Sequence, residues 1–409
     1  MASSSIKYRF ELPGRFSTVS MALMLIGLVS LIVGFLLYGM GEDNTRFWAT
    51  ILQNSVFFLM ICNSAMFFIC ATTLALGGWQ TSFRRVPEAI STAVPYLGVI
   101  AFLVLMILVF GNNKHIYHWS DKAAVEHDKI LKGKSSFLNP TFFTIWTILT
   151  IGIWSVVGYK MRKLSYQLDN DPLPTIEAGK KYIFTNTVWA SLFMVWFVLT
   201  VMSTTPWLWL MSIDAHWYST MYSWYTFAST FVSGIALITL FVIYLKNKGY
   251  LELTSEEHLH DLGKFQFAFS IFWTYLWFSQ FMLIWYANIP EETVYFQQRF
   301  HGVYAPIFWL NLIINFVAPL LIYMRRSSKR NYTLVAFMSA LILFGHWLDF
   351  YQMVFPSLYP NKVRMNLFDF GIAFGFLGLI MFIAGRALVK HPLIPRNHPY
   401  LKESVIHHT

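Results

Sequence analysis

Charged residues and cysteine are scarce in this sequence of 409 residues. Asp, Glu, Lys and Arg make up 12% of it, about half the share in an ordinary soluble protein, whereas 56% of the residues are hydrophobic and 19% are aromatic. A soluble domain could not bury this much apolar surface. The two cysteines, Cys62 and Cys70, lie in one apolar segment and form neither a disulfide framework nor a metal-binding cluster. The composition therefore predicts an integral membrane protein.

Ligands for redox cofactors are also missing from the sequence. It contains no CxxCH motif for covalent haem and no cysteine cluster for iron–sulfur. A b-type haem in a membrane usually needs two deeply buried histidines, and only His346 lies deep within an apolar segment. The net charge of +10 does not indicate nucleic acid, because the basic residues lie in short loops between apolar segments. We therefore predict that this chain itself binds no redox cofactor and no nucleic acid.

Ten apolar segments are long enough to cross the hydrocarbon core of a bilayer, which takes about 20 helical residues. They cover residues 19–40, 48–76, 91–110, 141–159, 183–205, 218–245, 265–287, 304–324, 332–354 and 367–389. Backbone groups in lipid must be satisfied within the segment, and no period-two alternation indicates barrel strands, so we expect helices. The predicted fold is an all-α integral membrane protein, a single polytopic domain over residues 1–409. The number of helices suggests two four-helix bundles, helices 2–5 and 6–9, with the first and last helices at the periphery.

The distribution of basic residues predicts the orientation in the membrane. More than two thirds of the 30 Lys and Arg residues fall on the side that holds both termini, which the positive-inside rule assigns to the cytoplasm. Residues 1–18 and 390–409 are therefore expected to be cytoplasmic, and the loop 111–140, with one short helix, periplasmic. Thr254 and Glu257 have the spacing of a capping box, which predicts that the seventh helix begins in the cytoplasm.

The sequence GHWLDFYQMVFP, residues 345–356, brings two ionisable residues into the ninth apolar segment. His346 and Asp349 are three residues apart and therefore share one face of a helix. An ionised group near the bilayer centre costs about 2.5–3.5 kcal/mol on insertion scales, so such groups usually face a bundle interior or water. Histidine titrates near neutral pH, so the pair could hydrogen-bond and hold one proton between them. The alternative is that the pair only pins the ninth helix to a neighbour.

Other ionisable residues gather near the ends of the predicted helices. Further candidates for proton transfer, which could line an outer half-channel together with this pair, are Asp214, His216, Glu291 and Asp369. On the inner side, the candidates are His258 and Asp261 at the mouth of the seventh helix. Hydroxyl and amide side chains on the sixth and seventh helices could order water between the two groups. Taken singly, each outer residue is more simply a solvated loop residue or a helix cap, and small polar side chains commonly pack helices together in lipid.

Three stretches resemble a known family. They are DAHWYSTMYSWY (214–225), HDLGKFQFAFSIFWTYLWFSQFMLIWYANIPEET (260–293) and LFGHWLDFYQMVFP (343–356). With ten predicted spans and both ends inside, the chain is similar to the F subunit of bacterial alternative complex III, within the polysulfide-reductase, NrfD-type family of membrane anchors. The resemblance covers essentially the whole chain.

The resemblance implies a place in the respiratory chain of the bacterial inner membrane. Complexes of this family oxidise quinol and pass electrons to cytochrome c or a terminal oxidase. The implied partners are a homologous ten-span subunit with the quinol site, a multihaem cytochrome c, an iron–sulfur subunit and a terminal cytochrome oxidase. Haem c and iron–sulfur clusters are then expected in those partners, with membrane lipid around this chain. The F subunit is treated as a structural partner with a proposed proton route, which here would involve His346, Asp349, Asp214 and His216.

The predicted function is that of a non-redox membrane subunit of a quinol:electron-acceptor oxidoreductase, with a proton-conducting path. Whether this chain contacts quinol or menaquinol, and so whether it takes part in catalysis, stays open at this point. One alternative is a stand-alone secondary transporter, although Pro206, Pro306 and Pro319 lie at or near span ends and no matched pair of mid-span breaks is evident. The other alternative is a purely structural scaffold subunit.

Overall fold

A computed structural model describes residues 9–41, 44–111, 114–170 and 172–408 of the chain. These residues contain helices and no strand, and ten helical segments among them are long and apolar enough to cross a membrane. The protein is therefore a multi-pass, all-α integral membrane protein, which confirms the prediction. Residues 1–8 of the expected cytoplasmic N-terminal segment lie outside the described residues.

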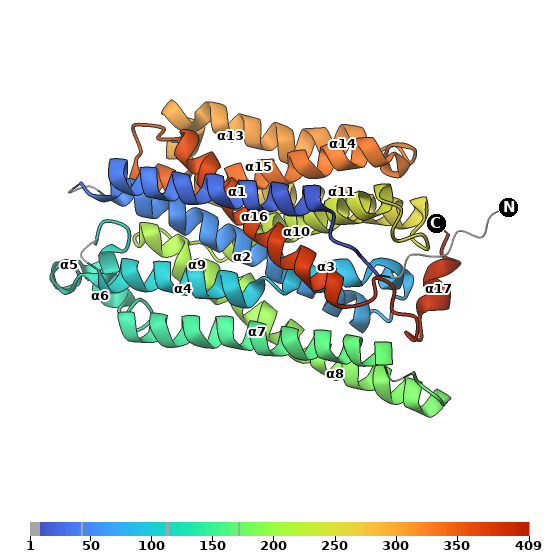
Figure 1. Ribbon diagram of the computed structural model, residues 1–409. Helices are drawn as coiled ribbons and strands as arrows, with labels where there is room; N and C mark the ends of the chain where they lie inside the picture. Colours follow the sequence, from blue (N-terminus) through green and yellow to red (C-terminus); the bar gives the residue numbers. More distant parts are fainter. Residues whose placement is uncertain (1–8, 42–43, 112–113, 171, 409) are drawn as a thin grey trace.

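Several of the spans combine more than one helical element (Figure 1). The first is α1 (Gly14–Gly34) with the π-helical turn η1 (Phe35–Gly39), the second α2 (Thr45–Leu74), the third α3 (Arg85–Ser91) with α4 (Val94–Phe110), the fourth α7 (Pro140–Asn170), and the fifth α8 (Ile176–Leu199), η4 (Thr200–Thr204) and α9 (Thr205–Trp209). The sixth is α10 (Met221–Asn247), the seventh α11 (Glu256–Ala287), the eighth α13 (Ala305–Leu312), η7 (Ile313–Val317) and α14 (Ala318–Tyr323), the ninth α15 (Tyr332–Leu358) and the tenth α16 (Leu367–Lys390). Shorter helices outside the spans include α5 (Lys122–His127), α6 (Lys129–Lys134), α12 (Pro290–Phe300) and α17 (Leu401–Val405).

The spans form two four-helix bundles, as predicted from their number. In the first bundle α2 packs against α4 and α8, and α7 packs against the same two helices. In the second, α10 packs against α11 and α15, and the eighth span closes the bundle by contacting both α11 and α15. α1 and α16 pair with each other outside the bundles (Figure 1).

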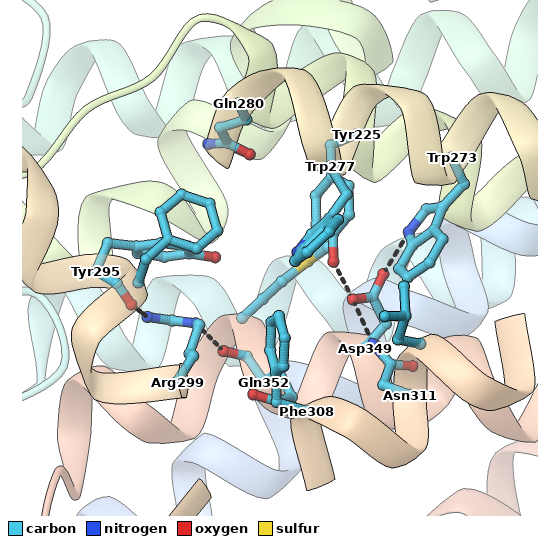
Figure 2. A pocket seen from close by; sticks show the side chains of 13 residues that line it. Tyr225, Trp273, Trp277, Gln280, Tyr295, Arg299, Phe308, Asn311, Asp349 and Gln352 are labelled. Carbon is cyan, nitrogen blue, oxygen red and sulfur yellow. Dashed lines mark hydrogen bonds between the residues drawn. The ribbon is translucent and has the colours of Figure 1, made fainter. Parts of the chain in front are cut away.

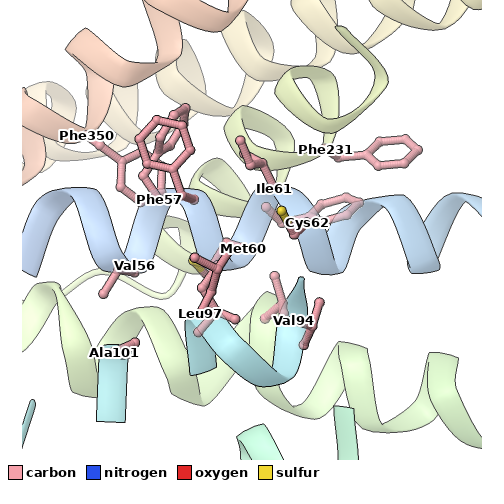
Figure 3. Close-up of a cluster of buried hydrophobic side chains, with 14 of the residues drawn as sticks. Val56, Phe57, Met60, Ile61, Cys62, Val94, Leu97, Ala101, Phe231 and Phe350 are labelled. Atoms are coloured by element: carbon pink, nitrogen blue, oxygen red, sulfur yellow. The ribbon is translucent and has the colours of Figure 1, made fainter. Parts of the chain in front are cut away.

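The two bundles meet through α2 and α10, the most deeply buried spans. Figure 3 shows α2 between the third span and α15, with Phe57 beside Phe350 at a ring-centroid distance of 5.0 Å. Cys62 is fully buried in this core and carries a free thiol, as does Cys70. Both cysteines therefore pack as small apolar side chains.

Glycines allow α1 and α16 to approach closely. A Cβ atom placed on Gly27 would lie 2.3 Å from the Cα atom of Gly375, so neither position has room for a side chain. In lipid, where apolar side chains gain little by leaving their surroundings, such small residues allow the backbone contact that holds two helices together. The α1–α16 pair is thus held by backbone packing.

Three local predictions differ from the structure. The N-cap of α11 is Ser255 instead of Thr254, and its capping box uses His258, whose Nδ1 accepts a hydrogen bond from the Ser255 backbone N–H at 3.0 Å. Glu257, one residue earlier, accepts hydrogen bonds from Arg330 instead. The fourth helix runs to Asn170 instead of 159. The outer loop 111–140, where one short helix was expected, contains two short α-helices, α5 and α6.

The inner end of the molecule, defined as the end where both chain termini lie, is covered by the C-terminal tail (Figure 1). Beneath the tail Arg84 and Arg85 form ion pairs with Glu88 at 3.0 and 2.9 Å, and Arg85 also pairs with Asp169 at 2.6 Å. The tail joins this cluster where the Pro392 carbonyl accepts a hydrogen bond from Arg85 Nε at 3.2 Å. The buried charges therefore anchor the tail to the bundle.

His398 makes the docking of this tail sensitive to pH. Its ring packs edge-on against Tyr182, with centroids 5.8 Å apart, and is almost completely buried. Burial first, and then the positive charges of Arg84 and Arg85, lower the pKa of His398 well below its ordinary value of 6.5. Between that lowered pKa and 6.5 the released tail binds more protons than the docked tail, so docking is strongest above pH 6.5 and weakens as the pH falls.

We predict that proteolytic cleavage within residues 390–408 is faster at about pH 5.5 than at about pH 7.5, because protonation of His398 favours the released tail. The rate would be measured on the detergent-solubilised protein. His398→Asn should reduce the pH dependence, whereas the exposed His408→Asn should retain it. Equal pH dependence in the two variants would contradict the role of His398.

Candidate functional site

Asp349 lies on α15 at a point where donors from three other helices converge (Figure 2). Its Oδ1 atom accepts hydrogen bonds from the Tyr225 hydroxyl and from Asn311 Nδ2, the latter at 3.0 Å. Its Oδ2 atom accepts from Trp273 Nε1 at 3.0 Å. The carboxyl group is fully buried, and three donors to two oxygens are the surroundings that a buried carboxylate requires.

His346 lies beside Asp349, one helical turn closer to the inner end. Its Nδ1 atom is 3.8 Å from Asp349 Oδ2, which is too long for a hydrogen bond, and 3.0 Å from the Ser229 hydroxyl. Its Nε2 atom is buried and has no protein group within hydrogen-bonding distance. The pair therefore shares a face as predicted, but the direct hydrogen bond expected from the spacing is replaced by one to Ser229.

The π-helical turn η7 carries the neighbouring polar residues of the eighth span. Asn315 lies in this turn, and its Nδ2 atom donates to Asn311 Oδ1 at 2.6 Å, which orients the Asn311 amide toward Asp349. Such turns often mark functional sites in helices. Gly345 makes the contact possible, because a Cβ atom there would lie 2.2 Å from Asn315 Oδ1. Pro319 follows this turn inside the span, as Pro206 follows η4, so each lies next to a bulge within a continuous helix.

A narrow pocket extends from Asp349 toward the outer end of the molecule, away from the termini. Figure 2 shows Gln280, Arg299 and Gln352 around it, and aromatic side chains such as Trp277 complete the wall. The pocket has space for a water molecule but for nothing larger between the side chains as they stand. Several of its buried polar atoms, including both atoms of the Gln352 amide, have no protein partner.

A wider cavity, the outer vestibule, lies at the outer end and has a volume of about 910 Å³. Its polar lining includes His115, His118, Asp128, Asp214 and His216. His216 Nε2 lies 2.5 Å from Asp128 Oδ2, and this hydrogen bond is the main reason why the pKa of Asp128 is lowered. The pKa of His118 is lowered by burial and then by the neighbouring His115 and His216. The vestibule thus brings together the predicted Asp214 and His216 with three titratable residues of the outer loop.

The helix α12 separates the vestibule from the pocket. Val294 and Gln298 line the vestibule, whereas Tyr295 and Arg299 line the pocket. Trp217 holds α12 in place, since its ring stacks on Tyr295 at a centroid distance of 4.0 Å. The two cavities are therefore opposite sides of one short helix.

Asp369 and Glu291, the other outer candidates, do not line either cavity. Asp369 caps α16 and is fully buried in an ion pair with Arg46, at 2.5 and 2.9 Å, with a further hydrogen bond from the Thr50 hydroxyl at 2.9 Å. Glu291 is exposed in the first turn of α12. Their surroundings are those of a structural ion pair and of a solvated helix terminus.

The inner candidates are held in contacts with the C-terminal tail. His258 caps α11, and its Nε2 atom is 3.2 Å from the Ser404 hydroxyl of the tail. Asp261 pairs with Lys264 at 2.5 Å and with His407 at 2.7 Å. Between these residues and His346 lies a buried apolar cluster that includes Val232, Ala236, Met338 and Ile342. On α15, Ile342 and Met338 occupy the next two turns inward from His346, and among these apolar side chains lies the buried Gln266 amide, hydrogen-bonded to Thr239, Ser339 and Tyr323.

Sequence reasoning missed most of the residues around Asp349. Tyr225, Trp273 and Asn311 lie in apolar segments where aromatic and amide residues are common, and nothing in the sequence marks them as partners of Asp349. Arg299 is not among the predicted site residues, although an isolated arginine among aromatic residues before a span is a signal that could have indicated it. No family model matches the sequence, and no curated protein matches it either. Among the described residues, no group of three or more His, Cys, Asp or Glu side chains is arranged to hold a metal ion.

We predict that Gly345→Ala destabilises the protein by about 1–3 kcal/mol, because the added methyl group displaces Asn315 and with it the Asn311 hydrogen bond to Asp349. The free energy of unfolding would be measured by chemical denaturation in detergent. The matched control is Gly152→Ala on α7, where a Cβ atom meets open space and the change should stay within about 0.5 kcal/mol. Equal stability of the two variants would contradict the close packing of η7 on α15.

We also predict that Asp369→Asn lowers the free energy of unfolding by about 3–5 kcal/mol, because it leaves the buried Arg46 guanidinium without its counter-charge. Glu291→Gln, at an exposed position, should change it by less than about 0.5 kcal/mol. The same denaturation measurement compares the two. If Asp369→Asn unfolds at the denaturant concentration of the wild type, the ion pair has no structural role.

Proposed function

We propose that this chain is a non-redox integral membrane subunit of a quinol:electron-acceptor oxidoreductase of the alternative complex III type, and that Asp349 exchanges protons there. The observation that carries the proposal is the fully buried Asp349 carboxyl group, which lies in an apolar span within a shell of donors and opens on a pocket sized for water. A buried ionisable residue with this access to water is suited to accept and release a proton. His346, with its unpartnered Nε2 atom next to the site, is the second proton carrier.

The surroundings of Asp349 favour exchange with the outer side only. The pocket and the vestibule both lie between Asp349 and the outer end, and α12 separates them. On the inner side the buried polar groups beside Met338 and Ile342 are Gln266, Thr239, Ser339 and Tyr323, which hydrogen-bond with one another and line neither the pocket nor the vestibule. In this proposal the vestibule, with Asp214 and His216, is the aqueous mouth of the site.

The orientation follows from the basic residues. They are concentrated at the end that holds both termini, which supports placing that end in the cytoplasm and the vestibule in the periplasm. In this proposal the membrane is the bacterial inner membrane. The periplasmic loop with α5 and α6 offers a surface for subunits outside the membrane. The proposed partners are a multihaem cytochrome c and an iron–sulfur subunit, a homologous ten-span subunit with the quinol or menaquinol site, and a terminal oxidase. Electrons pass through these partners.

The π-helical turns η4 and η7, each followed by a proline, are the feature that favours a secondary transporter. Transporters bind their substrates near discontinuous helices at the membrane midplane. The pocket beside η7 has no space for a solute larger than water, however, which favours protons as the transferred species. Purification in mild detergent distinguishes the two functions: co-purifying haem supports the complex, and a colourless single chain supports the transporter.

We predict that His346→Ala and Asp349→Asn lower quinol-dependent turnover of the assembled complex at least about tenfold, because each removes a proton carrier. Turnover would be measured against pH on purified complex, with haem content as the measure of assembly. Gln297→Ala, at an exposed position of α12, is the control and should behave as wild type.

Two outcomes contradict the proton role. If both variants keep wild-type turnover and pH dependence, the site does not transfer protons. If both lose the haem-containing subunits, the pair is a structural contact and the chain is a scaffold.

A further inference from the structure

Arg299 is a buried arginine without a carboxylate partner. Its Nη1 atom donates to the Tyr295 carbonyl at 2.7 Å, and its Nε atom donates to the Gln352 carbonyl at 3.0 Å. Its Nη2 atom has no protein group within hydrogen-bonding distance, although the side chain is only 3% exposed. No Asp or Glu in the described part of the chain lies within 4.0 Å of the guanidinium. This distinguishes Arg299 from the buried Arg46 and Arg85, each of which contacts an acid.

The surroundings of Arg299 hold it in place without neutralising it. The guanidinium stacks on the Tyr295 ring, with its central carbon 3.4 Å from the ring centroid. The two accepting carbonyls are neutral groups on α12 and α15. An unpaired charge is costly to bury, so a counter-charge close by is required. Asp349 is the one acid among the residues that line the same pocket, and it lies at the opposite end of that pocket.

The groups between Arg299 and Asp349 are suited to ordering water. Gln352 has both amide atoms buried without a protein partner, and Gln280 has its Nε2 atom in the same condition. Figure 2 shows both amides at the rim of the open space between the two charges. A water molecule is stably bound when it makes two to four hydrogen bonds, and these groups supply both donors and an acceptor.

We infer that Arg299 is a positioning residue for Asp349: its charge, transmitted through water that Gln280 and Gln352 order, keeps Asp349 ionised and able to accept a proton from the outer side. The inference rests on the proposed function. When a proton arrives, a hydronium ion in the pocket gives it up, an O–H bond forms on an Asp349 oxygen, and a neutral water remains. Arg299 is then left uncompensated, which favours return of the proton to the outer side. The pair thus acts as a reversible outward-facing proton acceptor.

The test compares Arg299→Gln and Arg299→Lys in the assembled complex, with Gln297→Ala on the exposed face of α12 as the control. Two quantities would be measured: quinol-dependent turnover against pH, and the infrared C=O stretch of protonated carboxyl groups. At neutral pH, Arg299→Gln should show a new carboxylic-acid band that a second substitution, Asp349→Asn, removes. Turnover should fall about tenfold and its acid limb should shift by about one pH unit. Arg299→Lys, which keeps the charge, should restore most of the wild-type turnover profile and most of the wild-type infrared spectrum.

A complex with Arg299→Gln that has wild-type haem content, turnover profile and infrared spectrum overturns the inference. If that variant does not assemble, Gln280→Leu provides the same test, since it removes a pocket donor whose Nε2 atom has no protein partner; a wild-type spectrum and profile in Gln280→Leu then overturns the inference. Asp349→Asn distinguishes a failure of the proposed function from a failure of the inference about Arg299. Wild-type turnover in that variant rejects the proposed function itself, whereas low turnover in Asp349→Asn with normal turnover in Arg299→Gln rejects only the role of Arg299.

Discussion

A carboxylate placed inside a membrane protein has to be surrounded by hydrogen-bond donors, and in this protein four spans are arranged around that requirement. Tyr225 on α10, Trp273 on α11 and Asn311 on α13 all donate to Asp349 on α15. The π-helical turn η7 and the missing side chain at Gly345 bring the eighth span close enough to take part. The second bundle therefore combines helix packing and charge stabilisation in one set of contacts.

Buried charges are held in two contrasting ways in the two bundles. Arg46 with Asp369, and Arg84 and Arg85 with Glu88 and Asp169, form direct ion pairs that fasten α2 to α16 and the C-terminal tail to the first bundle. In these direct pairs each carboxylate accepts hydrogen bonds from its arginine, so protonating it would break a structural contact. Arg299 and Asp349 instead lie at two ends of a polar pocket, with amide groups between them. Only this second arrangement allows a charge to change without breaking a structural contact.

The spans could be predicted from the length of the apolar segments, and their number suggested the two bundles. The shared face of His346 and Asp349 could be predicted from their three-residue spacing, because a helix keeps that spacing on one face. The partners of Asp349 could not. Asn311 and Asn315 lie four residues apart on the buried face of the eighth span, but amide side chains at this spacing commonly pack helices together, so the sequence does not identify Asn311 as a partner of Asp349. Arg299 lies on a short helix in a predicted loop, and only the fold turns it into the bundle. The cap of α11 lies one residue later than predicted, because His258 Nδ1 accepts from the Ser255 backbone N–H while Glu257 pairs with Arg330.

The pairing of α1 with α16 has a consequence for biogenesis. α1 is synthesised long before α16, and their glycine contact at Gly27 and Gly375 joins segments that lie far apart in the sequence. Until residues 367–390 have been synthesised, α1 lacks its main neighbour, so only lipid or an insertion factor can cover its face around Gly27. The pair can thus form only after the eight spans between α1 and α16 have been synthesised, and a chain that stops before residue 367 leaves α1 without its partner helix.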